Sequence, residues 1–67
     1  MPIVQVSVWK GITLENKRKV VKGITKVFED LGVPKEAVEI VIYEAPKSSW
    51  ATGGQLHSER LANTPSL

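Results

Sequence analysis

The sequence predicts an α+β fold: a β–α–β unit followed by a C-terminal hairpin and tail, with the sheet completed by pairing between subunits. Residues 2–9 and 38–44 have the composition of strands, and the segment between them has the period of an amphipathic helix. Strands joined through a helix run parallel, with a right-handed crossover. Because two strands alone do not make a stable sheet, the same pattern predicts self-association.

The first strand is expected over residues 2–9, PIVQVSVW. Alternation with polar residues gives it one apolar face, formed by Val4, Val6 and Val8. Ile3 and Trp9 fall on the opposite face and are large for a surface in water. We therefore expect another subunit to cover part of that face.

A helix is expected from about Thr13, which can act as its N-cap, to the LGVP segment. One apolar stripe follows the helical period: Val20, Ile24, Val27, Phe28 and Leu31. Gly32 can take the positive φ of a helix C-terminus, and Pro34 prevents continuation. Gly23, inside the helix, either packs closely against the sheet or is a tolerated surface glycine.

The second strand is expected over residues 38–44, VEIVIYE, and Pro46 ends it. Gly53 and Gly54 offer the positive φ angles of a hairpin or tight turn. The segment from His57 to Leu67 has no clear period. It is expected either to lie across a neighbouring subunit or to be disordered.

Composition restricts the function classes. The 67 residues make a single domain, 1–67, that is too short to bury a large core. No cysteine is present, so neither a disulfide framework nor a thiolate metal site is expected. The net charge of +2 is mild, and the one basic cluster, KRK at 17–19, suits a solvated helix face better than a nucleic-acid surface. With no recognisable secretory or membrane-spanning segment, we expect a cytoplasmic protein.

Four segments in this order and spacing, MPIVQV, GITLENK, VEIVIYE and WATGGQL, resemble the 4-oxalocrotonate tautomerase family of the tautomerase superfamily. The resemblance covers about residues 2–60, and residues 61–67 look like a C-terminal extension. It implies a tautomerase-like fold and a homohexamer, a trimer of dimers in which each dimer forms a four-stranded sheet. It also implies an isomerase that needs no cofactor or metal and acts on small enol or α-keto carboxylates.

The resemblance makes Pro2 the catalytic base. Its nitrogen is a secondary amine only after Met1 is removed; before that, it is an amide without a usable lone pair. An α-amino group has an ordinary pKa of about 7.7–8.0, and desolvation in a pocket would lower it toward the neutral, basic form. A carboxylate at Glu39 would oppose that shift if it lies near Pro2.

Pocket residues follow from the same resemblance. Trp50 matches the aromatic residue that forms a wall of the family's pocket. Trp9 matches a residue at the edge of that pocket, and it is equally expected to be a core residue. The two arginines that hold dicarboxylate substrates are replaced by Ile12 and Glu39, neither of which can make a bidentate contact. Turnover of 2-hydroxymuconate would then require another cation, and the candidates are Lys10, Lys17, Arg18, Lys47 and Arg60. His57, the one histidine, is expected on the surface.

Two alternatives remain open at this point. In one, a protonated Pro2 acts as an acid or assists water addition or decarboxylation. In the other, the chain is a non-catalytic or otherwise specialised oligomer that has kept the scaffold, as the loss of both arginines would allow.

Overall fold

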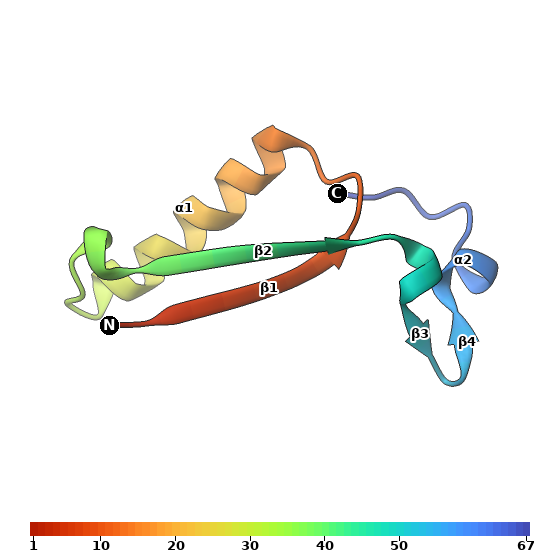
Figure 1. The fold of residues 1–67 in the computed structure, drawn as a ribbon. Coiled ribbons are helices and arrows are strands. Elements are labelled where there is room, and N and C mark those ends of the chain that lie inside the picture. The colour runs from red at the N-terminus through yellow and green to blue at the C-terminus, as the bar shows by residue number, and fades with distance from the viewer.

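The computed structural model describes all residues, 1–67, and confirms the predicted β–α–β unit. In chain order its elements are β1 (Ile3–Trp9), α1 (Leu14–Asp30), the 3-10 helix η1 (Lys35–Ala37), β2 (Glu39–Ala45), the 3-10 helix η2 (Lys47–Ser49), β3 (Ala51–Thr52), β4 (Gln55–Leu56) and α2 (His57–Arg60). Strands β1 and β2 pair in parallel, from Ile3 opposite Glu39 to Trp9 opposite Ala45. Helix α1 runs back along one face of this pair (Figure 1).

The ends of α1 are fixed by the residues that the sequence indicated. Thr13 is extended, and its Oγ1 accepts a hydrogen bond from the backbone N–H of Asn16 at 3.1 Å. At the other end, Gly32 has a φ of +92°. The N–H of Gly32 bonds the Glu29 carbonyl, and the N–H of Val33 bonds the Phe28 carbonyl. These two bonds make a Schellman motif, which satisfies carbonyls that the helix end would otherwise leave free.

The apolar stripe of α1 is only partly as predicted. Val20, Ile24 and Phe28 are half-buried, but Val27 and Leu31 are 59% and 74% exposed, so their assignment to the covered stripe is wrong for the single chain. The reason is the width of the sheet, because two strands cover only a narrow band of a helix. Gly23 has no atom within 4 Å of where a Cβ would stand, so it is a surface glycine and does not pack against the sheet.

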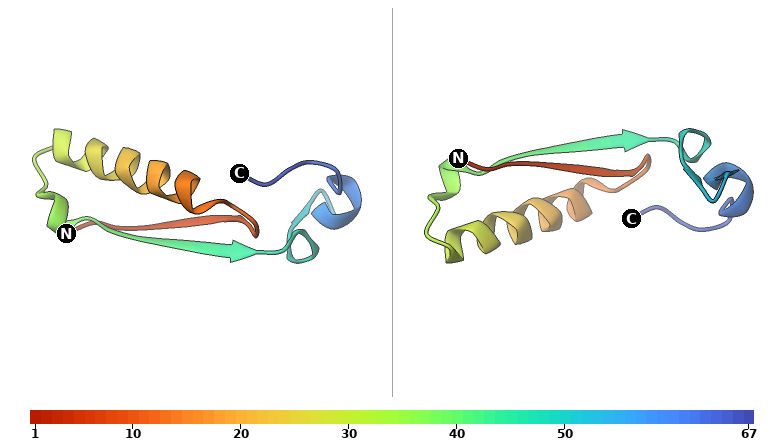
Figure 2. Two further views of the ribbon diagram at one scale, coloured as in Figure 1. Left: turned by 90° about the horizontal axis from the view of Figure 1, so that it is seen from above. Right: turned by 90° about the horizontal axis from the view of Figure 1, so that it is seen from below.

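The face of the sheet away from α1 has no cover within the chain (Figure 2). Ile3, Val41 and Tyr43 on this face are 63%, 38% and 49% exposed. Only Ile12 and His57 are buried in the whole chain. The radius of gyration is 14.6 Å, whereas a compact chain of this length would have about 11 Å. A single chain therefore buries too little of its apolar surface to form a compact core of its own.

The C-terminal third departs most from expectation. The predicted hairpin is present, with Gly53 and Gly54 at φ angles of +61° and +81° between β3 and β4. Helix α2 was not predicted. Residues 61–67, called the tail below, fold back toward the β1–α1 turn of the same chain (Figure 1). No helix in the structure is long and apolar enough to span a bilayer.

Candidate active site

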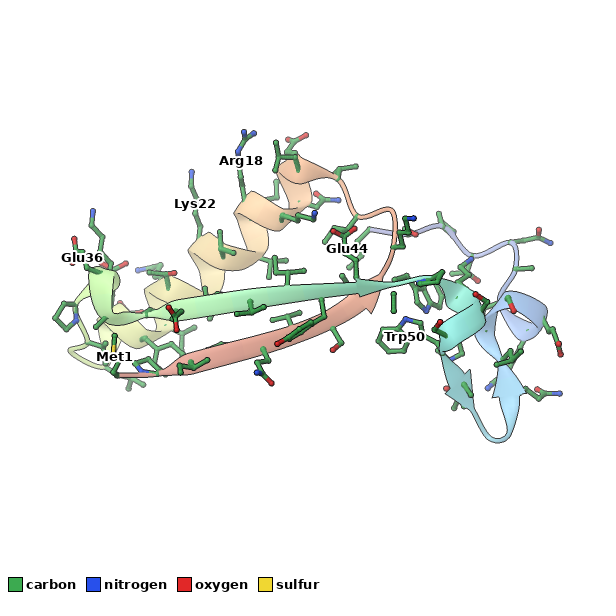
Figure 3. The ribbon with its side chains drawn as sticks, in the orientation of Figure 1. Met1, Arg18, Lys22, Glu36, Glu44 and Trp50 are labelled. Carbon is green, nitrogen blue, oxygen red and sulfur yellow. The ribbon has the colours of Figure 1, made fainter.

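The predicted site residues lie at two opposite ends of the sheet. At one end, the N–H of Glu39 donates to the carbonyl of Pro2 at 3.1 Å. At the other end, Trp9 pairs with Ala45, whose carbonyl accepts a hydrogen bond from Trp50 Nε1 at 3.1 Å. A strand rises about 3.3 Å per residue, so roughly 20 Å separates the two ends. Figure 3 shows Met1 and Trp50 at these opposite ends. One chain therefore does not bring Pro2 and Trp50 together.

The Trp50 end is organised around His57, which is buried rather than on the surface as expected. Trp9 Nε1 donates to His57 Nδ1 at 2.9 Å, and His57 Nε2 lies 2.7 Å from Thr52 Oγ1. The Trp50 ring stacks on the imidazole with centroids 5.7 Å apart, and the Trp9 ring meets it edge-on at 5.5 Å. Since Nδ1 accepts from Trp9, the ring proton is on Nε2 and is donated to Thr52. We call Trp9, Trp50 and His57 the aromatic cluster.

A cavity of about 380 Å³ opens beside the aromatic cluster. It is lined by Val8, Trp9, Trp50, His57, Pro65 and Leu67. Cavities of about 300–1,000 Å³ commonly hold small molecules. The indole N–H groups of Trp9 and Trp50 and both ring nitrogens of His57 are already engaged within the chain. This lining therefore offers a ligand mainly apolar and aromatic surface.

Ile12 is 7% exposed, does not line this cavity, and is the most buried side chain of the molecule. The sequence suggested Ile12 as a pocket residue in place of an arginine. In the single chain it is a core residue at the β1–α1 turn. Glu39, the other replacement, is exposed at the Pro2 end.

Two of the candidate cations are occupied by groups of their own chain. Lys47 Nζ donates to the carbonyls of Leu61, at 2.7 Å, and Thr64, and it lies 4.6 Å from the centre of a Trp9 ring. Lys17 Nζ donates to Glu44 Oε2 at 2.6 Å. That hydrogen bond is the main cause of a lowered pKa of Glu44.

The other candidate cations are exposed, and none lines the cavity: Lys10, Arg18 and Arg60. Arg18 points away from the sheet (Figure 3). Within one chain, no free cation is available at the cavity to receive a carboxylate. No three His, Asp or Glu side chains come together in a group that could hold a metal ion.

A second depression of about 570 Å³ lies between α1 and η1. Its lining is mostly charged, with both signs present: Val21, Lys22, Thr25, Lys26, Glu29, Asp30 and Lys35. It contains none of the residues singled out in the sequence and has no aromatic wall. The candidate site is therefore the aromatic cluster together with the Pro2 end of the sheet.

Comparison with known proteins identifies the fold. Residues 2–60 match the family model described as "Tautomerase enzyme". A probable tautomerase from Ralstonia nicotianae is 34% identical over 55 residues, which cover 81% of this chain and 79% of the relative. The 2-hydroxymuconate tautomerase of Comamonas testosteroni is 31% identical over 55 residues, covering 81% of this chain and 87% of that protein.

Solved structures agree. A structure from work on the 4-oxalocrotonate tautomerase isozymes of Methylibium petroleiphilum has a TM-score of 0.83 and 35% identity, covering 91% of this chain and 97% of that one. TomN, a 4-oxalocrotonate tautomerase homologue of the tomaymycin biosynthetic pathway, has a TM-score of 0.84 and 29% identity, covering 96% and 100%. A structure from an analysis of trans-3-chloroacrylic acid dehalogenase activity has a TM-score of 0.73 and 28% identity, covering 82% and 97%. The α+β fold with its β–α–β unit is thus the fold of these proteins, and residues 61–67 lie beyond the family match.

Proposed function

Because the chain belongs to the tautomerase family, we propose that it is a cofactor-independent tautomerase whose general base is the amine of Pro2, exposed by removal of Met1. Its substrates are small enol or α-keto carboxylates. The observation that supports this most is the place of Pro2, which is the first residue of the family match and directly precedes β1. Pro2 is half-buried, and its carbonyl is held by the N–H of Glu39.

Tautomerisation needs one group that accepts a proton from the substrate and then donates a proton back to another substrate atom. The lone pair of the proline amine accepts the enol hydroxyl proton while the C–O bond becomes a carbonyl, and the ammonium so formed delivers a proton to the carbon that ends the enol system. The amine is regenerated, so no net proton or electron is gained. Such a base works best when its pKa lies near the working pH, which suits an α-amino group.

A second copy of the chain is part of the proposal, because the Pro2 end and the aromatic cluster lie at opposite ends of one sheet. Two copies arranged antiparallel place the Pro2 end of one beside the aromatic cluster of the other. The uncovered face with Ile3, Val41 and Tyr43 gives such an assembly apolar surface to bury. We propose a homohexamer, a trimer of dimers. A 4-oxalocrotonate tautomerase from Chloroflexus aurantiacus, 23% identical and with a TM-score of 0.81, is a heterohexamer.

The test is an ultraviolet assay of enol ketonisation on a small panel of enol carboxylates. Wild type is compared with Pro2→Ala and with Pro34→Ala, an exposed proline in the loop before η1 that serves as a matched control. Intact mass reports whether Met1 is removed, and light scattering reports the oligomer. We expect loss of Met1, turnover by wild type and Pro34→Ala, and about a hundredfold or greater loss in Pro2→Ala. Retention of Met1, or equal turnover by Pro2→Ala in an intact oligomer, contradicts the proposal.

A second candidate function is addition of water by a protonated Pro2. The exposed carboxylate of Glu39 begins the strand beside Pro2, and a nearby carboxylate favours the ammonium form of an amine. The pH profile of kcat/KM separates the two roles. Activity that rises as Pro2 loses its proton supports the base, and activity that falls above about pH 8 supports the acid. Pro2-dependent turnover of any substrate excludes a purely non-catalytic oligomer.

A further inference from the structure

Hydrogen bonds attach both ends of the tail to the rest of the chain. At its start, Lys47 Nζ donates to the carbonyls of Leu61 and Thr64. At its other end, Ser66 Oγ donates to the carbonyl of Lys10 at 2.8 Å, and Asn16 Nδ2 donates to a backbone oxygen of Leu67. The four bonds join residues that are 14 to 56 positions apart in the sequence. They hold a segment that has no strand or helix of its own beyond Arg60.

The path between these two anchors runs past the aromatic cluster. Pro65 and Leu67 line the cavity together with Trp9 and Trp50. A Cβ on Gly11 would stand 3.1 Å from Ser66 Oγ, so the turn after β1 is shaped to let the tail approach closely. Two apolar side chains from beyond the family match thus become walls of the cavity.

The chemical character of the cavity is unsuited to a second carboxylate. The polar side-chain groups of its lining are engaged within the chain, as described above. The ammonium of Lys47, 4.6 Å from the centre of a Trp9 ring, is bonded to tail carbonyls and is not part of the lining. A carboxylate placed there would lose its water and gain no partner, which is costly. An aryl or branched alkyl group would instead lie against indole and aliphatic surface.

We propose that the tail makes this cavity a subsite for the uncharged end of the substrate, so that the enzyme selects enol or keto monocarboxylates that carry an aryl or branched alkyl group. That the bound molecule is a substrate rests on the proposed tautomerase function, whereas the preference for an apolar group rests on the cavity lining alone. Pro65 and Leu67 are the specificity-determining residues of this apolar subsite. The substrate carboxylate then points out of the cavity, toward the Pro2 end of a partner subunit.

A binding experiment tests the preference without depending on turnover. The probes are 3-phenylpropionate, which has one carboxylate and an apolar phenyl end, and adipate, a dicarboxylate of similar length. Trp9 and Trp50 are the only tryptophans, so intrinsic emission reports directly on the cavity. We expect wild type to bind 3-phenylpropionate about tenfold or more tightly than adipate.

Variants of Leu67 then assign the effect to the tail. Leu67 is 66% exposed, so its replacement is not expected to unfold the chain. Leu67→Ala should weaken 3-phenylpropionate binding about tenfold. Leu67→Lys places a free cation at the cavity and should shift the preference toward adipate. Leu31→Ala is the matched control, because Leu31 is similarly exposed, at 74%, and lies at the end of α1 remote from the cavity.

Equal binding of the two probes by wild type overturns the inference, as does unchanged 3-phenylpropionate affinity in both Leu67 variants. Its failure is distinct from failure of the proposed function. If Pro2→Ala abolishes turnover while the Leu67 variants bind like wild type, only the tail subsite is wrong. If the Leu67 variants behave as expected while Pro2→Ala retains full turnover, the apolar subsite stands and the catalytic proposal is wrong.

Discussion

Replacing His57 is expected to release the whole C-terminal region. The imidazole holds Trp9 through Nδ1, contacts Thr52 through Nε2 and stacks on Trp50. In His57→Ala, each lost hydrogen bond costs about 1 kcal/mol of unfolding free energy. Each lost aromatic contact costs about 0.5–1.5 kcal/mol. The sum is about 3–5 kcal/mol, against a total of about 3–10 kcal/mol for a chain of this length.

Urea unfolding followed by tryptophan emission measures this loss. The protein concentration must be the same for every variant, because association adds to the apparent stability. Thr52→Val removes only the bond at Nε2 and should cost about 1 kcal/mol. His57→Asn keeps an acceptor oxygen near the position of Nδ1, so it should recover about 1 kcal/mol relative to His57→Ala.

The indole N–H resonance of Trp9 gives a local check that stability alone does not provide. In wild type and His57→Asn it should have the shift of a bonded N–H, and in His57→Ala that of an indole in water. A loss below about 1 kcal/mol in His57→Ala, with an unchanged Trp9 resonance, would refute the reasoning. It would mean that the backbone of the hairpin, and not the imidazole, holds the aromatic cluster.

Three further predictions concern the ion pair, the glycines and the tail. Lys17→Met removes the hydrogen bond that lowers the pKa of Glu44, so carboxyl NMR titration should show that pKa rising toward its ordinary value. In wild type, the lowered pKa stabilises the fold at neutral pH, and this stabilisation is lost as the pH falls through the lowered pKa. The variant should lack this pH-dependent stabilisation. Gly54→Ala should lower the free energy of unfolding by about 1–2 kcal/mol, because φ is +81° there, whereas Gly23→Ala, with open space around the new Cβ, should raise it by about 1 kcal/mol; urea unfolding should show the opposite signs. Lys47→Met should speed amide hydrogen exchange in the tail by about tenfold while α1 exchanges as before.

Most of the β–α–β unit could be predicted from the sequence because its signals are local. The alternation in β1, the Thr13 cap and the Gly32 turn each act within a few residues, and each has the geometry that the sequence indicated. The exposure of Val27 and Leu31 could not be predicted, because helical period alone does not tell how wide the covering sheet is. Width depends on how many strands stand beside each other, and here one chain supplies two.

The sequence carries a local signal for the burial of His57. A two-residue Gly-Gly turn fixes the register of the hairpin, with Thr52 opposite Gln55 and Ala51 opposite Leu56. The next pair outward is Trp50 with His57, whose N–H does donate to the Trp50 carbonyl at 2.9 Å. The position of the tail had no such signal. Its contacts join Ser66 to Lys10 across 56 positions, and no period or local motif encodes a contact of that range.

The two replaced arginine positions now have different physical meanings. Glu39 is exposed and begins β2, so an arginine there would need only surface space. Ile12 is 7% exposed, and an arginine there would have to bring a charge into the core or displace the β1–α1 turn on which the tail rests. The turn, the tail and the cavity are coupled through this packing, since Gly11 beside Ile12 receives Ser66 and the tail supplies Pro65 and Leu67. A single substitution at position 12 is therefore not expected to give dicarboxylate binding, whereas a cation carried by the tail, as in Leu67→Lys, reaches the cavity without a change in the core.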